Sequence, residues 1–365
     1  MPLSERVLMG PGPCNPYPEA TAAFARPMLG HLDPEFIELL DEPNERLRTV
    51  FGTANALTFP VSGTGSAGME AAIVNLLGPG DTVVIGVNGV FGMRMCDLAA
   101  RCGADVVRVD AEWGQPVDTA RMLEAHPNPS MYAVVHAETS TGVRTDVEEL
   151  GANKGDALLL IDCVTSLGGL PMDLDTWGVD AAYSGTQKCL GVAPGLSPLT
   201  LSDTARERIK PVPQSWYLDL NMIAAYVGSD GGARAYHHTA PISMIFSLHA
   251  GLGAVLDEGI PEVIARHAAC GEAIQAGVQK LGLKLFAAEG HRLPQLTSVW
   301  VPEDRLPGSA TEADVRSLLL SRYGIEIGGG LGPVAGKVWR IGCMGNTARL
   351  RNVELLLGAL DEILD

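Results

Sequence analysis

The stretch Asp180-Ala-Ala-Tyr-Ser-Gly-Thr-Gln-Lys188 is the point around which the rest of the chain can be interpreted. Its pattern predicts a short apolar strand that runs into a turn of small residues and ends at one lysine. A lysine on a tight turn beyond a buried strand can be desolvated, which lowers the pKa of its amine and makes it a nucleophile that forms Schiff bases. An ordinary solvated loop lysine is the alternative, and this stretch alone does not decide between the two.

The bulk composition limits the class of protein. The chain has 365 residues, 46% hydrophobic and 19% charged, which is enough for a large core in one or two domains. Its formal net charge is −17 and it has no basic stripe, so we expect no binding to nucleic acid. No apolar run reaches the length of a membrane span, and the first residues lack the apolar segment of a signal peptide, so we expect no membrane association.

The cysteines indicate a reducing environment. Their number is odd and no two of them form a C-x-x-C pair. The seven cysteines are Cys14, Cys96, Cys102, Cys163, Cys189, Cys270 and Cys343. This usage is typical of a cytoplasmic protein without a disulfide framework or a zinc site. We therefore expect a cytoplasmic location and no bound metal.

Strand-like and helix-like patterns alternate along most of the chain, which predicts an α/β fold with a mostly parallel sheet. The expected strands are 82–87, 105–109, 132–138, 157–162 and 198–202, after a short apolar run that begins at Leu57. The expected helices are 35–51, 69–77, 91–102, 217–228, 242–258 and 262–281.

Three segments follow from the composition. Residues 1–20 are rich in Pro and Gly, which exclude a regular helix or an inner strand, and we expect an extended arm packed on another surface such as a partner subunit. Residues 21–258 form the expected large domain. The composition changes near Gly259-Ile-Pro261, so residues 259–365 form an expected smaller α+β domain, with strands 296–301 and 337–341, a helix at 311–323 and a final helix.

Polar residues follow the expected strands where each one ends. They are the segment 62–66, the pair Thr139-Ser140, the carboxylate Asp162 and the amine Lys188. In a parallel α/β sheet, ligands bind outside the carboxyl ends of the strands, so we expect these groups to meet in one crevice. A carboxylate after so apolar a strand needs a cationic partner, and a helix cap or a surface loop is the alternative for Asp162.

The segment Gly63-Thr-Gly-Ser-Ala-Gly68 has the form G-x-G-x-x-G before an expected helix. Dinucleotide binding would need an acidic residue after the next strand, but Asp81 precedes that strand, so this alternative is disfavoured. Small residues at a helix N-terminus expose backbone N–H groups, and the hydroxyls of Thr64 and Ser66 lie beside them, which suits a phosphate. A tight strand–helix packing turn is the other interpretation.

Two further segments carry candidate ligands. The glycine-rich loop 328–333 precedes Arg340 on a strand, and an arginine there can bind a carboxylate through two hydrogen bonds, unless it is an ordinary rim arginine. Residues 230–241 form a loop rich in side-chain donors that includes His237-His238. Adjacent histidines point apart, so a metal site is not expected.

A lysine, a strand-terminal carboxylate and a phosphate cup are what pyridoxal phosphate requires. With these residues in place, the sequence resembles the class V aminotransferases of fold type I, in particular the alanine–glyoxylate and serine–glyoxylate aminotransferase group, nearly from end to end. The likeness is carried by Gly10-Pro-Gly-Pro13, Ser62-Gly-Thr-Gly65, Glu138-Thr-Ser-Thr-Gly142, Asp162-Cys-Val-Thr-Ser-Leu-Gly-Gly169, Tyr183-Ser-Gly-Thr-Gln-Lys188, Tyr236-His-His-Thr239 and Arg340-Ile-Gly342.

The resemblance implies pyridoxal 5′-phosphate as the cofactor and a role at each matched position. Lys188 corresponds to the Schiff-base lysine that later moves the substrate proton, and Asp162 to the partner of the pyridine nitrogen. Arg340 corresponds to the residue that binds the substrate carboxylate, and His31 borders the substrate pocket across the dimer with its role open. The other implied cofactor contacts are Thr64, Gly65, Ser66, Phe91, Thr139 and Gln187 from this subunit, with Tyr236 and Thr239 reaching the phosphate of a second subunit.

The resemblance also implies a homodimer with shared active sites, a small amino acid and a 2-oxo acid as substrates, and the transfer of an amino group from alanine, or else serine, to glyoxylate. Two positions depart from the common family pattern: Phe91 is often Trp, and Ser66 is often His. A ureidoglycine–glyoxylate enzyme is an alternative, against which Tyr236 and the likeness along the whole chain weigh. Lyase or desulfurase chemistry is disfavoured because loop 327–337 has no cysteine, and an NAD-dependent dehydrogenase is the remaining alternative.

Overall fold

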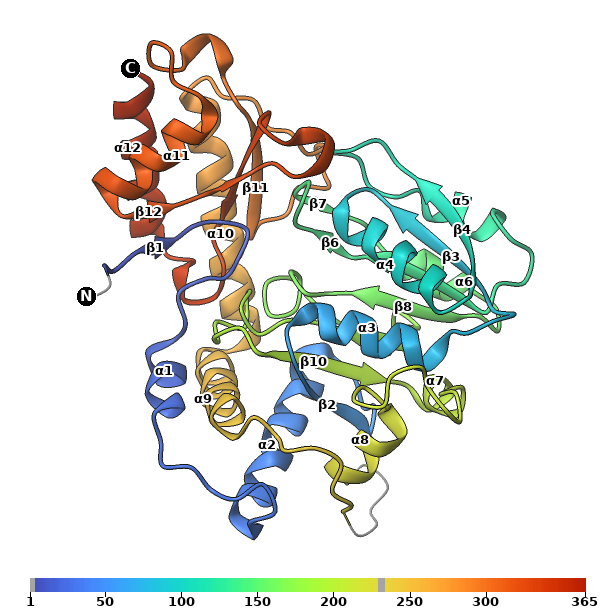
Figure 1. The fold of residues 1–365 in the computed structure, drawn as a ribbon. Coiled ribbons are helices and arrows are strands. Elements are labelled where there is room, and N and C mark those ends of the chain that lie inside the picture. The colour runs from blue at the N-terminus through green and yellow to red at the C-terminus, as the bar shows by residue number, and fades with distance from the viewer. Residues whose placement is uncertain (1–3, 229–233) are drawn as a thin grey trace.

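Residues 4–228 and 234–365, which the computed structural model describes, contain a central seven-stranded sheet (Figure 1). Strand β10, which lies between β2 and β9, runs antiparallel to both of them, and every other pair of adjacent strands in this sheet is parallel. The predicted α/β fold with a mostly parallel sheet is therefore confirmed. The order across the sheet is β2 (Leu57–Ser62), β10 (Leu196–Leu201), β9 (Ala181–Tyr183), β8 (Leu158–Asp162), β5 (Met131–Val135), β3 (Thr82–Val87) and β4 (Asp105–Asp110).

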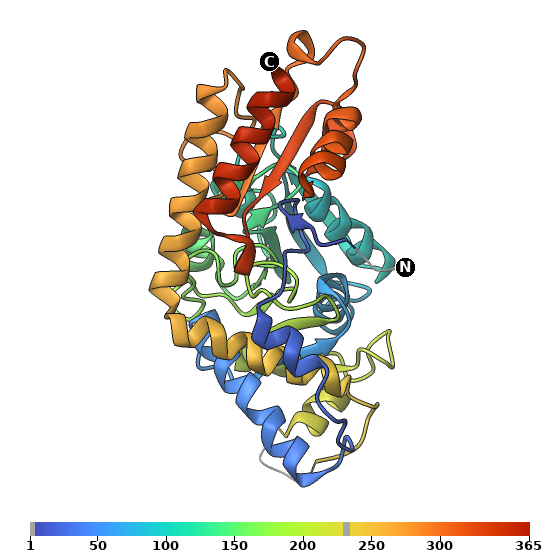
Figure 2. The same ribbon diagram turned by 90° about the vertical axis from the view of Figure 1, so that its left-hand side faces the viewer.

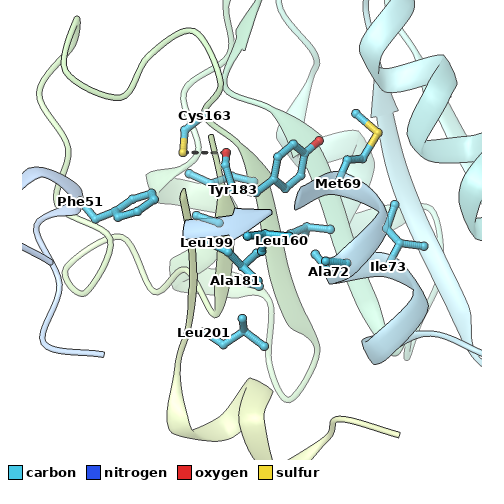
Figure 3. Packing of buried hydrophobic residues seen from close by; sticks show 14 of the residues in the cluster. Phe51, Met69, Ala72, Ile73, Leu160, Cys163, Ala181, Tyr183, Leu199 and Leu201 are labelled. Atoms are coloured by element: carbon cyan, nitrogen blue, oxygen red, sulfur yellow. Dashed lines mark hydrogen bonds between the residues drawn. The ribbon is translucent and has the colours of Figure 1, made fainter. Parts of the chain in front are cut away.

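The central strands read as nearly continuous apolar runs because they are covered on both faces. Every residue of β5, β8 and β9 is buried. Figure 3 shows Tyr183 of β9 with Met69, Ala72 and Ile73 of the neighbouring helix, all in one hydrophobic cluster. The helices of this part are α1 (Pro18–Phe24), α2 (Pro34–Phe51), α3 (Gly65–Leu76), α4 (Val90–Arg101), α5 (Thr119–Glu124), α6 (Glu148–Asn153), α7 (Asp203–Glu207), α8 (Leu220–Val227) and α9 (Ile242–Glu258).

The C-terminal part has its own cluster of buried residues around a three-stranded sheet. Its elements are α10 (Ile260–Lys280), β11 (Leu296–Trp300), α11 (Glu312–Tyr323), β12 (Ile325–Glu326), β13 (Gly328–Gly329), β14 (Val338–Gly342) and α12 (Leu350–Leu364). Figure 2 shows α10 running along one side of the molecule. Val263 near its start belongs to the first cluster and Cys270 to the second, so this helix packs in both. The division into 1–20, 21–258 and 259–365 stays a prediction.

The N-terminal arm packs on its own chain. Strand β1 (Val7–Leu8) pairs in parallel with β12 at the edge of the C-terminal part. The backbone N–H groups of Cys14 and Tyr17 donate to Gln187 and Gly191 of the loop that holds Lys188. The arm is mostly irregular, as its prolines and glycines require, but α1 begins at Pro18 instead of after residue 20. Its first three residues lie outside the described residues.

Some predicted boundaries are wrong for local reasons. The expected strand 132–138 breaks at His136, whose N–H donates to the carbonyl of Asp162, and β6 (Ala137–Glu138) then pairs with β7 (Val143–Arg144). The helix expected from 217 begins at Leu220, because the Asp219 carboxylate caps its first turn. The helix expected from 69 begins at Gly65. Residues 230–233 of the donor-rich loop lie outside the described residues.

None of the described helices combines the length and the apolar character that crossing a membrane requires. All seven cysteines are free and buried. Several of them line the strand ends and loops described next.

Candidate active site

The polar strand ends meet at one edge of the sheet. Because β10 is antiparallel to both β2 and β9, the strands β2, β9, β8 and β5 all point their carboxyl ends the same way. The first residue of α3, Gly65, lies against the segments that follow β8 and β9. A Cβ at Gly65 would stand 2.9 Å from Val164 Cγ2 and 3.4 Å from the Ser184 carbonyl oxygen. The segment after β2 therefore adjoins the segments that carry Asp162 and Lys188.

Lys188 is only 8% exposed, so it is not an ordinary solvated loop lysine. Its Nζ donates to the Pro11 carbonyl of the N-terminal arm. Gly12 is so close that a Cβ there would stand 2.5 Å from Nζ, so only glycine fits beside the amine. Burial, followed by the charge of Arg340, lowers the pKa of Lys188 to about 8. A far larger fraction of neutral, nucleophilic amine is thus present near neutral pH than in an ordinary lysine.

Asp162 ends β8 as a carboxylate that is 2% exposed. One oxygen accepts from the Val164 N–H at 2.8 Å, and the other accepts from the Tyr183 hydroxyl at 2.8 Å. Burial raises the pKa of Asp162 to about 7, while these two hydrogen bonds oppose the rise. Such a carboxylate is ready to ionise fully when a cationic partner arrives.

Glu138 is a second buried carboxylate at the same edge, and the sequence interpretation gave it no role. It accepts from the N–H and hydroxyl of Ser140 at 2.9 and 2.6 Å and from the Phe91 N–H at 3.1 Å. It therefore joins the Thr139 turn to the first turn of α4, where Phe91 lies half-buried. Burial raises the pKa of Glu138.

Arg340 lies on the central strand of the small sheet and is 7% exposed, so it is not a rim arginine. Its Nε donates to the Gly329 carbonyl at 2.7 Å, and its Nη1 donates to the Thr139 carbonyl at 3.2 Å. These two bonds fix the guanidinium between the glycine loop and the turn that carries Thr139. Burial lowers the pKa of Arg340 to about 10, and at neutral pH the group stays charged.

The candidate phosphate cup is built on the N-terminus of α3. Thr64 is the N-cap but makes no side-chain cap, and the first turn contains no acidic residue, so the N–H groups there keep their positive character. Thr64 and Ser66 are exposed. The buried Oε1 of Gln187 has no hydrogen-bond partner within the described residues.

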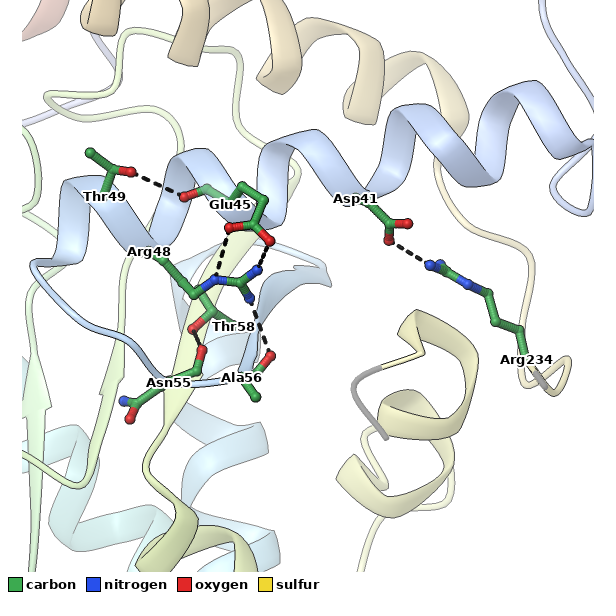
Figure 4. A network of polar contacts seen from close by, with 8 residues as sticks. All are labelled: Asp41, Glu45, Arg48, Thr49, Asn55, Ala56, Thr58 and Arg234. Atoms are coloured by element: carbon green, nitrogen blue, oxygen red, sulfur yellow. Dashed lines mark hydrogen bonds and ion pairs between the residues drawn. The ribbon is translucent and has the colours of Figure 1, made fainter. Parts of the chain in front are cut away.

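Three predicted site residues form a second group, and the described residues show no contact between any of them and Lys188. The rings of Tyr236 and His31 are 5.1 Å apart, and the Tyr236 hydroxyl is 3.5 Å from Thr239 Oγ1. Figure 4 shows how Arg234, just before this group, is tied to α2 by an ion pair of 2.5 Å with Asp41. Tyr236 is 56% exposed. The described residues thus hold this group beside α2 and on the surface.

The two adjacent histidines have separate partners. His237 Nε2 is 3.1 Å from the Tyr217 carbonyl oxygen, and His238 Nε2 is 3.1 Å from Ser62 Oγ. In the described part of the chain, no group of three or more His, Cys, Asp or Glu side chains is placed to hold a metal ion.

Other neighbours of the site could be found in the sequence only as parts of motifs. Pro11 and Gly12 belong to Gly10-Pro-Gly-Pro13, and Glu138 and Tyr183 each open a quoted motif. What the sequence does not show is the contact each one makes. Tyr183 reaches Asp162 because the two residues are register partners on adjacent parallel strands.

The comparisons with known proteins agree with this geometry. The class-V aminotransferase family profile matches residues 14–344. The alanine–glyoxylate aminotransferase of Callithrix jacchus is 40% identical over 373 residues, covering 100% of this chain and 89% of that protein. The (S)-ureidoglycine–glyoxylate transaminase of Bacillus subtilis is 34% identical over 386 residues, covering 98% and 90%.

A solved structure extends the likeness to three dimensions. The crystal structure of an alanine–glyoxylate aminotransferase from Nostoc sp. superposes with a TM-score of 0.94 at 42% identity, covering 100% of this chain and 97% of that one. The fold type I architecture expected from the sequence is therefore confirmed. The chain belongs to the class-V aminotransferase family.

Proposed function

We propose that this protein uses pyridoxal 5′-phosphate to move the amino group of alanine to glyoxylate, which yields pyruvate and glycine. The observation that carries the proposal is the buried Lys188, which lies at the same sheet edge as Asp162. The pKa of Lys188 is lowered by burial and by the positive charge of the nearby Arg340. Serine is the second donor that we propose, and the names of the relatives support glyoxylate as the acceptor.

The residues present fit the proposed cofactor. The α3 N-terminus offers uncapped N–H groups to a phosphate, and Gly65 allows close approach because a side chain there would meet Val164. The Gln187 side chain has one buried amide position without a partner, and with the amide turned over its Nε2 would stand there as a donor for a phosphate oxygen. Asp162 would hold the ring nitrogen, Phe91 would stack on the ring, and Thr139 would contact its oxygen.

When bound, the cofactor would supply an electron sink and an amino-group carrier. The protein residues supply the rest of the chemistry. Arg340 would bind the substrate α-carboxylate through the N–H groups that Gly329 and Thr139 leave free. Lys188 Nζ would take the proton from the substrate Cα and deliver it to the cofactor carbon C4′, because an amine with a pKa of about 8 can accept and release a proton near neutral pH.

Ureidoglycine is an alternative donor to alanine and serine, and one observation supports it. The crystal structure of a ureidoglycine–glyoxylate aminotransferase from Bacillus subtilis superposes on this chain with the same TM-score, 0.94, at 35% identity. Alanine, serine and ureidoglycine would all present an α-carboxylate to Arg340. The choice among them therefore lies in the protein groups around the rest of the substrate.

We also propose a homodimer in which Tyr236 and Thr239 contact the phosphate bound by the other subunit. Their exposed position, with no contact to Lys188 among the described residues, supports a role across a subunit boundary. His31 would then border the same pocket. The seven free, buried cysteines support a reducing compartment, for which we propose the cytoplasm.

A titration and a substrate panel test the proposed activity. The purified protein should gain visible absorbance when pyridoxal phosphate is added, and should form pyruvate from alanine only when glyoxylate is present. Lys188→Ala should abolish both signals, and Lys280→Ala, a change at the end of α10, should leave them intact. Serine and (S)-ureidoglycine as donors rank the alternatives. A protein that takes up no cofactor would refute the proposal.

A further inference from the structure

Arg94 on α4 joins two residues of the candidate cofactor site that come from different helices. Its Nη1 donates to Ser66 Oγ at 3.0 Å, and its Cζ lies 5.0 Å from the centroid of the Phe91 ring. Ser66 is in the first turn of α3 and Phe91 is in the first turn of α4. One guanidinium therefore spans the N-terminal ends of both helices and contacts the ring through a cation–π interaction.

Arg94 lacks an ion-pair partner in the part of the chain that the structure describes. Within residues 4–228 and 234–365, no carboxylate lies within ion-pair distance of it, whereas Arg101 on the same helix pairs with Asp97 at 3.0 Å. The first turns of α3 and α4 contain no acidic residue. In a chain with 43 acidic and 26 basic residues, an unpaired cation beside two helix N-termini marks a place suited to an anion.

The contact with Ser66 also sets which way that hydroxyl can act. The oxygen of Ser66 accepts from Arg94, so its own hydrogen remains available to donate to a ligand. The N–H groups of the same helical turn carry no side-chain cap from Thr64. Arg94, Ser66 and the α3 N-terminus thus present positive charge and donors from the same side.

We propose that Arg94 is a positioning residue that strengthens binding of the phosphate group of pyridoxal phosphate, through its charge and through Ser66. The inference rests on the proposed function, because the anion it addresses is the cofactor phosphate. A phosphate carries close to two negative charges near neutral pH, so loss of a nearby cation costs affinity for the phosphorylated ligand alone.

The test compares two ligands that share one aldehyde. Cofactor-free protein is titrated with pyridoxal phosphate and with pyridoxal, which lacks the phosphate, and the dissociation constants are read from the absorbance change. Arg94→Gln should weaken binding of pyridoxal phosphate about tenfold and leave pyridoxal binding unchanged. Arg94→Lys keeps the charge and should retain most of the affinity. Arg101→Gln, the same loss of charge on the same helix, is the matched control and should change neither constant.

Each outcome separates the inference from the proposed function. If Arg94→Gln weakens both ligands equally, Arg94 acts through Phe91 or the fold, and the inference is wrong. If pyridoxal phosphate binds the variant as tightly as the parent, the inference is also wrong. If the parent protein binds neither ligand, the proposed function itself fails. Should Arg94→Gln not fold, Ser66→Ala carries the test, with weaker binding of pyridoxal phosphate and unchanged binding of pyridoxal expected.

Discussion

Lys188 is the residue whose ionisation is most directly measurable. Its folded pKa of about 8 is below the ordinary lysine value of 10.5, because burial and Arg340 disfavour the ammonium form. At pH 7 roughly one amine in ten is then neutral, against about one in three thousand for an ordinary lysine. The neutral amine is the nucleophile, so the sign is clear: cofactor uptake should speed up as pH rises and level off above about pH 8.

The prediction is a plateau in rate near pH 8. The rate at which cofactor-free protein takes up pyridoxal phosphate is measured between about pH 6 and pH 10, and divided at each pH by the rate constant for the neutral form of a small model amine, which removes the cofactor's own titration without adding that of the amine. Arg340→Ala should move the plateau to higher pH, since it removes a nearby positive charge. Arg322→Ala, an exposed arginine that pairs with Glu362, should not. A rate that still climbs tenfold per pH unit at pH 9 would contradict the lowered pKa.

The positions of the site residues were predictable where they depend on strand ends, and their partners were not. Asp162 and Lys188 follow apolar runs that predict buried strands, and parallel strands bring their ends together. Thr139 follows the short β6 instead, because β5 ends at Val135. The Tyr183 hydroxyl on Asp162 depends on the register of β8 against β9, and the Pro11 carbonyl at Lys188 depends on where an irregular arm packs. Neither leaves a periodic signal in the sequence.

At the scale of single elements, helix α3 confirms one of two interpretations of its motif, and the other stays a proposal. The segment 63–68 was expected to be either a phosphate cup or a tight packing turn. In the structure Gly65 adjoins the strand ends, while a Cβ at Gly68 would overlap Ser197 of β10 and stand 3.1 Å from Tyr183 Cβ. Gly68 therefore lets the helix approach the sheet, which confirms the packing turn, while the phosphate cup stays a proposal.

The packing role of Gly68 gives a stability prediction. Gly68→Ala should lower the free energy of unfolding by about 1–3 kcal/mol, because the added methyl overpacks the contact with Ser197. Gly358→Ala is the matched control: this glycine lies within α12 with no atom within 4 Å of its Cβ position, so the change should stabilise by about 0.5–1 kcal/mol. Urea unfolding of the cofactor-free proteins measures both. If Gly68→Ala left the free energy of unfolding unchanged, helix α3 would be able to move away from β10.

The misplaced element boundaries share one physical cause. Gly65-Ser-Ala-Gly68 has low helix propensity, and the run 132–138 contains neither Gly nor Pro to signal the end of β5. Tertiary contacts override both patterns, through packing of α3 on the sheet and through the hydrogen bond from His136 to the Asp162 carbonyl. By contrast, the junction between α9 and α10 was predictable because Gly259 takes a φ of 94° and Pro261 follows at the start of α10.

At the scale of the whole molecule, Arg266 connects the parts of the chain. From α10 it donates to Glu258 at the end of α9, to the Tyr17 hydroxyl at the start of α1, and to the carbonyls of Gly345 and Ala348 before α12. His267 beside it accepts from the Gly345 N–H, so its proton lies on Nδ1, which faces the Val263 carbonyl. Burial lowers the pKa of His267 to about 4, which keeps the ring neutral and this arrangement intact.

The proposed dimer predicts that two inactive variants regain activity when they are mixed, which a site built from one chain alone would not allow. Tyr236 and Thr239 lie together on the surface, close in sequence to Arg234, which pairs with Asp41 of α2. Lys188 is buried at the sheet edge. Under the proposed dimer, the two sets act on one cofactor from different subunits. A chain with Lys188→Ala and a chain with Tyr236→Ala and Thr239→Ala would each form inactive homodimers, yet a mixed dimer would contain one site with all three native residues.

Mixing the two inactive variants should therefore restore activity. After dissociation and random reassociation at equal amounts, half of the dimers are mixed and each has one intact site of two, so about a quarter of the parent activity should return. The alanine–glyoxylate assay measures it, and the mass in solution confirms the dimer. The matched control mixes Lys188→Ala with a chain that carries both sets of changes; that pair contains no intact site in any arrangement and should stay inactive. No recovery in the first mixture would place Tyr236 and Thr239 on the site of their own chain, or outside it.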